Sequence, residues 1–136
     1  ANPIAWLVWH LTRVQDDHIA GAFGTGQVWA DGGWADRFGL PAGTLEIGYG
    51  HTSEQVAAVA AKTSAAGELL VDYHEATYEQ TISRVSSVTD ADLARVVDRN
   101  WTPEVTLGVR LVSVINDGTQ HIGQAAFIRG ILLRAS

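Results

Sequence analysis

The chain has 136 residues, a formal net charge of −6 and no cysteine. Its length suits one domain over residues 1–136, and a hydrophobic content of 46% is enough to bury a core. Its nine Lys and Arg residues are scattered, so no basic face that would bind nucleic acid is expected. Without cysteine, disulfides, thiolate metal sites and a cysteine nucleophile are excluded, and any thiol chemistry must use a thiol from outside.

We expect the protein to be cytoplasmic and not to enter a membrane. The absence of disulfides fits a reducing compartment. The apolar opening from Ile4 to Val8 is too short to span a bilayer and has no basic region before it, so we expect neither an anchor nor a signal peptide.

The first helix is expected from residue 3 to about residue 20. Pro3 suits the first helical turn with Asn2 as its cap, and Gly21 is expected to end the helix. Its apolar side chains recur at spacings of three and four, which is the pattern of an amphipathic helix. This stripe consists of Ile4, Leu7, Val8, Leu11, Val14 and His18.

A stretch rich in glycine and aromatic residues follows, from residue 22 to residue 51. We expect a long loop with one helical turn at Trp34–Phe38. A structureless loop of this length is unusual in a compact domain and is more often functional. We therefore assign the loop to a substrate pocket, with Trp34 and His51 among its lining residues.

Three further helices are expected before the last one. Thr52 and Gln55 offer a capping box for a short helix that ends near Ala61. A longer helix is predicted over residues 64–85, and another begins at Thr89. Because the sustained alternation typical of strands is absent almost everywhere, we predict an all-α protein, a helical bundle. The third of these helices would place Leu93, Val96 and Val97 on its apolar face.

The last helix, expected over residues 106–134, carries polar groups in the middle of its apolar face. Asp117 and His121 are four residues apart, so their side chains share one side of the helix. Burying both is costly unless something pairs with them. We interpret them as two ligands of one metal ion, and the alternatives are an exposed polar patch or a simple Asp–His hydrogen bond. The rest of the face consists of Val114, Gln124, Ala125 and Ile128.

Four glycines interrupt the same helix, and each costs about 1 kcal/mol of helix propensity relative to alanine. They suggest that a neighbouring helix or a ligand packs closely against it. These glycines are Gly108, Gly118, Gly123 and Gly130.

His10 on the first helix is the candidate third ligand. If the first and last helices pack together, it meets Asp117 and His121. Two histidines and one carboxylate leave a position open for water or substrate, which is the arrangement of a catalytic zinc site. Zinc is the default ion, and nickel or iron also suits these ligands. The alternative is a half-buried histidine bonded to a main-chain carbonyl.

Other charged residues near these helices have simpler interpretations. Arg110 and Arg129 lie about two turns from the Asp–His pair, and either could bind an anionic group or face solvent. We assign Arg129 to the substrate pocket. Asp16 and Asp17 are expected to be solvated or to form a pair near the helix end.

Three segments resemble the DinB-like superfamily, in particular the branch of thiol transferases related to mycothiol-dependent maleylpyruvate isomerase. The first is residues 6–18, with the pair His10-Leu11, and the second is residues 33–51. The third is residues 110–130, in which Asp117 is followed four residues later by His121-Ile-Gly-Gln. The resemblance implies an up-down four-helix bundle that holds a divalent metal, usually zinc, on His10, Asp117 and His121. It also implies that the metal activates a low-molecular-weight thiol such as mycothiol for attack on a small-molecule electrophile.

The chain departs from the family pattern in two ways. It begins almost at the helix that carries His10, so we expect a preceding segment or a partner chain, as in a homodimer, to fill the groove of the first family helix. Its late-helix acid is Asp117, where the isomerase branch has glutamate. Other expectations therefore stay open: a different metal-dependent enzyme, such as a hydrolase or biosynthetic isomerase, or a non-catalytic metal-binding dimer.

Overall fold

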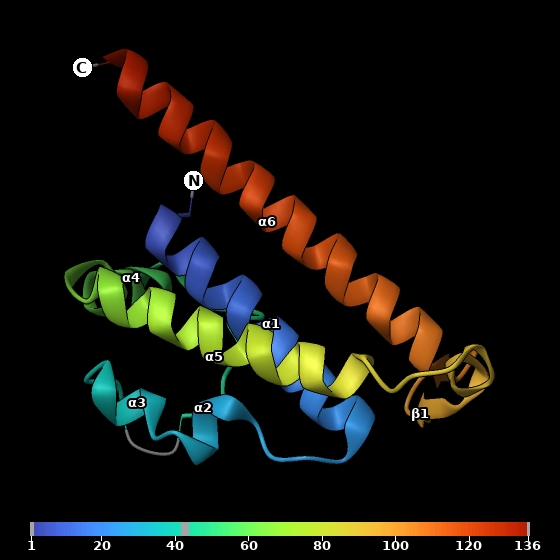
Figure 1. The fold of residues 1–136 in the computed structure, drawn as a ribbon. Coiled ribbons are helices and arrows are strands. Elements are labelled where there is room, and N and C mark those ends of the chain that lie inside the picture. Colours follow the sequence, from blue (N-terminus) through green and yellow to red (C-terminus); the bar gives the residue numbers. More distant parts are fainter. Residues whose placement is uncertain (1, 42–43, 136) are drawn as a thin grey trace.

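The computed structural model describes residues 2–41 and 44–135, which form an all-α fold around one central helix. The central helix α1 contacts α4, α5 and α6, and the chain ends on the long α6 that crosses over it (Figure 1). No helix among the described residues is long and apolar enough to cross a membrane. The α-helices are α1 (Ile4–Phe23), α2 (Val28–Asp31), α3 (Trp34–Arg37), α4 (Ser53–Ala65), α5 (Gly67–Val85) and α6 (Leu107–Ala135).

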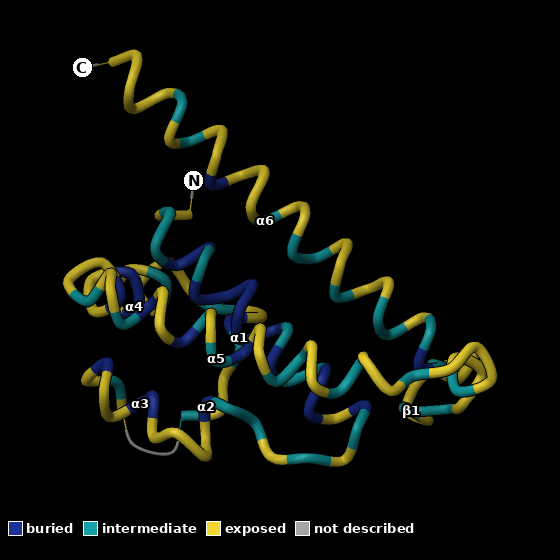
Figure 2. Tube along the Cα trace, viewed as in Figure 1, coloured by how far each residue is buried: buried dark blue, intermediate teal, exposed yellow. Residues whose placement is uncertain are grey.

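Helix α1 is buried on nearly every side because other helices surround it (Figure 2). It runs one turn further than predicted and ends at Gly24, whose φ of 63° lies in the left-handed region that glycine adopts without strain. The predicted stop at Gly21 is therefore wrong. Asn2 is not the cap either, because Pro3 occupies that position and makes no side-chain cap bond.

The stretch after α1 is less loop-like than predicted, because it contains the two short helices α2 and α3. It also supplies part of the hydrophobic core. Trp29, Trp34 and Phe38 are all buried, and the rings of Trp29 and Trp34 each lie 5.1 Å from the ring of Tyr73 on α5. These aromatic side chains fasten the segment to the bundle, since each buries a large apolar surface.

The middle of the chain agrees with the predicted pattern in α4 and α5. The predicted capping box is confirmed: the Thr52 side chain accepts from the Gln55 main chain, and the Gln55 side chain accepts from Thr52. The two helices meet at Ala66, whose φ of −125° and ψ of 49° break the helical path. The side chains that α5 buries are Leu70, Tyr73 and Thr77.

Between α5 and α6 the prediction of a further α-helix is wrong. A 3-10 helix, η1 (Asp90–Ala94), ends at Arg95, and a small antiparallel hairpin follows. Its strands β1 (Val96–Asp98) and β2 (Val105–Thr106) pair Val96 with Thr106 and Asp98 with Val105. Their β-branched residues suit strands, but strands this short cannot display the alternation by which a strand is predicted.

Helix α6 touches the rest of the molecule along one side and leaves much of its apolar surface exposed (Figure 2). Of its four glycines, Gly108 lies against another element, at the main-chain oxygen of Leu93, and Gly130 meets only Arg134 of its own helix. A Cβ at Gly118 or Gly123 would meet nothing within 4 Å. The prediction that a neighbouring helix packs closely is therefore wrong for these two. A groove of about 460 Å³ separates α6 from α5 above α1, and its apolar lining includes Leu11, Tyr78, Ile82, Val114, Ile115 and Ile122.

Candidate metal centre

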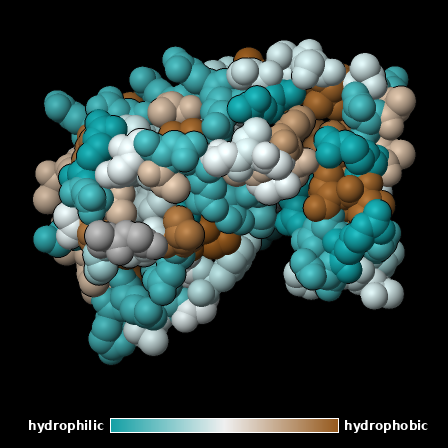
Figure 3. Space-filling view, turned by 90° about the horizontal axis from the view of Figure 1, so that it is seen from below, coloured by the Kyte–Doolittle hydropathy of each residue, from teal (hydrophilic) through white to brown (hydrophobic). Residues whose placement is uncertain are grey.

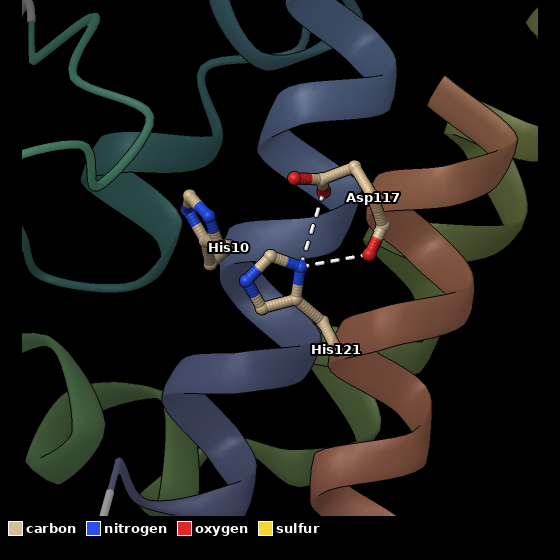
Figure 4. Close-up of side chains that lie close together, drawn as sticks. All are labelled: His10, Asp117 and His121. Carbon is tan, nitrogen blue, oxygen red and sulfur yellow. Dashed lines mark hydrogen bonds and ion pairs between the residues drawn. The ribbon is translucent and has the colours of Figure 1, made fainter. Parts of the chain in front are cut away.

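The structure brings His10, Asp117 and His121 together at the contact of α1 with α6 (Figure 4). One ligand atom from each residue lies within 4.8 Å of the other two, and His10 is buried while Asp117 and His121 are partly buried. A zinc ion holds its ligands at about 2.0–2.2 Å, so a small side-chain adjustment lets one ion contact all three. No other group of three or more acidic, histidine or cysteine side chains in the described part of the chain meets this criterion.

Both histidines are held in the tautomer that leaves Nε2 free to bind a metal. The Nδ1 of His10 bonds the main-chain oxygen of Ile47, and the Nδ1 of His121 bonds the main-chain oxygen of Asp117 at 2.8 Å. A carbonyl oxygen can only accept, so each Nδ1 carries the hydrogen and each Nε2 keeps its lone pair. Such bonds fix both the tautomer and the ring orientation of ligating histidines.

Asp117 offers a carboxylate oxygen that the protein leaves without a hydrogen bond. Its Oδ2 is buried and lies 3.2 Å from Nδ1 of His121, but that nitrogen points at the main-chain oxygen instead. Oδ2 of Asp117 and Nδ1 of His121 are therefore within ion-pair distance but share no hydrogen bond. The other oxygen accepts a long bond of 3.5 Å from the Tyr49 hydroxyl. A buried, unpartnered oxygen is costly, and a bound cation would remove that cost.

Gly48 lets the main chain approach His10 closely. Its φ is +100°, and a Cβ at this position would lie 2.7 Å from the Nδ1 of His10 and 3.0 Å from the Trp6 ring. Any other residue would therefore push the histidine away or displace Ile47, whose oxygen holds the ring. In the sequence, Gly48 stands out only as part of residues 33–51, the second of the three segments that carry the family resemblance. Its contact with His10 depends on the tertiary structure.

The segment that bonds His10 is itself held by a buried arginine. Arg13, one turn after His10 on α1, donates to the main-chain oxygens of Leu45 at 2.9 Å and Glu46 at 3.2 Å. Its guanidinium also contacts Asp16 at 3.5 Å, and both side chains are fully buried. Asp16 was expected to be solvated or to form a pair near the helix end, and solvation is wrong because its side chain is fully buried. A buried ion pair linked to other hydrogen bonds holds its partners in one arrangement.

Asp16 ties this arginine to the start of α2 and to α5. Its carboxylate accepts from the main-chain nitrogens of Val28 at 2.8 Å and Trp29 at 2.7 Å, and from the Tyr73 hydroxyl at 2.8 Å. Burial raises the pKa of Asp16, and these hydrogen bonds oppose that effect. The network connects α1 and α2, which are consecutive in the chain, to the more distant α5.

Burial also controls the charge of His10. Desolvation lowers its pKa below the usual 6.5, while its bond to Ile47 opposes this effect, and nearby His121 lowers the pKa further. A neutral imidazole is the form that binds a metal. The pocket thus holds His10 ready to act as a ligand near neutral pH.

The three residues assigned to a substrate pocket lie apart from one another. Trp34 is buried in the core, with the Arg37 guanidinium 3.7 Å from its ring. His51 accepts a hydrogen bond from the Trp6 indole at 3.4 Å, and its other ring nitrogen contacts the Glu46 carboxylate at 3.2 Å. Arg129 is exposed on α6, two turns beyond His121. Only His51 is close to the cluster, and it does not belong to the ligand set.

The remaining candidate, Arg110, does not face solvent freely. It donates to the Asp98 carboxylate at 2.7 Å, which links the start of α6 to the hairpin.

Tyr49, which the sequence did not single out, contacts two of the three candidate ligands. Its ring centre lies 5.3 Å from that of His10, and its hydroxyl donates to Asp117.

A family model described as the DinB superfamily matches residues 1–125, which is most of the chain. The protein belongs to the DinB superfamily. Its three candidate ligands lie within the matched residues. A solved structure described as the conserved protein of a locus from Enterococcus faecalis is 36% identical, with a TM-score of 0.79. The match covers 95% of this chain and 76% of that one. Comparison with curated proteins gives no match.

Proposed function

We propose that this DinB-superfamily protein is a metal-dependent thiol S-transferase, with zinc as the resident ion. The observation that supports the proposal is the ligand set itself: two histidines with free Nε2 lone pairs and one unpartnered carboxylate oxygen. Three protein ligands leave a fourth zinc position for an exogenous group. The chain has no cysteine, so the thiol would be a low-molecular-weight cosubstrate.

The bound metal would supply one piece of chemistry: it lowers the pKa of a thiol and so favours the nucleophilic thiolate at neutral pH. The protein's own residues hold the ion and orient the reactants. His10 and His121 are locked by main-chain oxygens, and Tyr49 lies beside Asp117 at the edge of the centre. In the net transfer, sulfur forms a bond to a carbon of the electrophile, the bond from that carbon to its leaving group breaks and the group departs with the electron pair, and the thiol proton goes to solvent.

The proposal is tested first by metal content. Purified wild type should carry about one equivalent of zinc, whereas His121→Ala and Asp117→Ala should lose most of it. His74→Ala is a matched control, because His74 lies on α5 and bonds Thr12 rather than the cluster. Equal metal in wild type and His121→Ala would show that the ion binds elsewhere.

The second test is thiol dependence. The zinc-loaded protein should consume a low-molecular-weight thiol together with an electrophile from a broad panel, and Asp117→Ala should abolish this reaction. Turnover of a substrate without any thiol would instead indicate a hydrolase or an isomerase on the same centre. Metal binding with no reaction across the panel would indicate a non-catalytic metal protein.

A further inference from the structure

A second feature adjoins the candidate metal centre: a groove of about 480 Å³ between the second half of α1 and the hairpin. Figure 3 shows the molecule hollowed between its helical body and the lobe that holds the hairpin. Two residues belong to both places, since Ile47 bonds His10 and Tyr49 bonds Asp117. A ligand in the groove therefore lies beside the centre. The groove's polar lining is Asp17, His18, Tyr49, Asp98, Asn100 and Arg110, with the Trp101 indole at one side.

The charges in this groove do not cancel. Asp98 is neutralised by Arg110 at 2.7 Å, and Asn100 donates to it as well. Asp17 has no such partner among the described residues: the Gln27 amide donates to its Oδ1 at 2.8 Å, and the only ion-pair contact is His18 at 4.0 Å. Burial lowers the pKa of His18, so this histidine is neutral at pH 7. One carboxylate, about a third exposed, is left uncompensated.

The position of Asp17 sets a length. It follows His10 by seven residues on α1, which corresponds to two helical turns or about 10.5 Å. A molecule bound by sulfur beside His10 must extend about two helical turns along α1 to reach Asp17. This excludes the smallest aminothiols and fits thiols of the size of a short peptide.

We propose that the groove binds the far end of the thiol cosubstrate, and that this end carries a protonated amine that pairs with Asp17. The inference rests on the proposed thiol-transferase function. An ammonium group satisfies the free carboxylate by a charge-assisted hydrogen bond. An anionic end would face the net negative groove, because the single arginine is already paired with Asp98. The exposed Trp101 ring adds a surface that attracts cations.

The test uses alkanethiols of one length as probes for the Co²⁺-substituted protein. Three chains that span about two helical turns would end in an amine, a hydroxyl or a carboxylate. Binding of sulfur is followed by the thiolate-to-cobalt absorption band in titrations at pH 7. The amine-ended thiol should bind about tenfold more tightly than the hydroxyl-ended one, and the carboxylate-ended thiol more weakly than both. A short aminothiol should show no such advantage.

Two variants of Asp17 and one control variant test whether Asp17 causes the preference for the amine-ended thiol. Asp17→Asn should remove the advantage of the amine, Asp17→Glu should retain part of it, and Asp72→Asn on the exposed side of α5 should leave it unchanged. Cobalt content and far-UV circular dichroism verify that each variant is folded and loaded. Equal binding of the three probes, or the same amine preference in Asp17→Asn, overturns this proposal but leaves the proposed function standing. Absence of bound cobalt or of the absorption band overturns both.

Discussion

His10 donates its Nδ1 hydrogen to the main-chain oxygen of Ile47, a residue thirty-seven positions further along the chain. This bond joins the central helix α1 to the segment that follows α3, and it leaves Nε2 of His10 free in a residue that clusters with Asp117 and His121. The metal centre therefore depends on a segment that contributes no ligand. Orienting bonds of this kind can change metal affinity by factors of about 10–100.

Gly48→Ala should weaken metal binding although no ligand is altered. The added methyl group would lie 2.7 Å from Nδ1 of His10, and alanine is strained at a φ of +100°. Either the ring or the Ile47 carbonyl must move. We expect the zinc affinity to fall about 10- to 100-fold, as measured by competition with a chromophoric chelator.

Gly50→Ala is the matched control for this experiment. Gly50 also has a positive φ, of +72°, but a Cβ there meets nothing within 4 Å. This variant should share the backbone strain without the contact with His10. Equal losses of affinity in both variants would mean that strain, and not the approach to His10, causes the effect.

Arg13→Met should destabilise the protein strongly. Removing the guanidinium leaves the Asp16 carboxylate buried without its cation and frees the main-chain oxygens of Leu45 and Glu46. Breaking a buried pair in this way costs about 3–5 kcal/mol. Urea unfolding followed by circular dichroism measures the loss. Arg13→Lys should recover only part of it, because an ammonium group lacks the planar fork that reaches several acceptors.

The Arg13 variants also test whether the network supports the centre. If Arg13 holds the segment that bonds His10, then Arg13→Lys should lower zinc affinity at temperatures where the variant is fully folded. Unchanged affinity in folded Arg13→Lys would limit the role of the network to stability.

The metal-free protein should lose stability as the pH falls below about 6.5. Burial lowers the pKa of His10 and of His18 in the folded state, so the unfolded chain binds protons at a higher pH than the folded chain does. Stability therefore rises with pH between the folded pKa values and 6.5, and is lost as the pH decreases through this interval. Urea midpoints measured with a chelator present, between about pH 5 and pH 7.5, show the slope.

His18→Asn should reduce that slope, because it removes one of the two groups whose protonation differs between folded and unfolded states. His18 is outside the ligand set, so the variant can be compared with wild type without changing the metal ligands. A slope identical to that of wild type would mean that His18 is protonated equally in both states.

The groove between α5 and α6 should bind a hydrophobic dye. Tyr78, Ile115 and Ile122 line this groove and are each more than half exposed. An apolar patch of this kind is unusual on a monomeric protein surface. Replacing Ile115 and Ile122 together by glutamine should remove most of the enhanced fluorescence of anilinonaphthalene sulfonate, whereas Val109→Gln, on α6 but outside the groove, should not.

Light scattering on the same variants tests the homodimer, which stays a prediction. If two copies associate through this groove, the wild type should have the mass of a dimer, and the double glutamine variant that of a monomer. Strong dye binding that persists in the double variant would place the exposed apolar surface elsewhere.

The sequence by itself determined the features that depend on local periodicity. Apolar spacings of three and four located the long helices, and spacing of four placed Asp117 and His121 on one side of α6. The capping box at Thr52 is likewise a local signal. Each of these follows from the geometry of one helix, so no knowledge of other segments was required.

Only the tertiary structure decided which polar groups are buried and what they contact. Asp16 looks like a surface residue in the sequence, but α1 is enclosed on nearly every side, so its pairing with Arg13 occurs in the core. The sequence assigned Trp34 to a substrate pocket, whereas packing against Tyr73 buries it in the core. The short hairpin depends on the antiparallel pairing of β1 with β2, in which Val96 lies opposite Thr106. In each case the outcome depends on how separate elements pack against or pair with one another, and helical periodicity carries no information about such contacts.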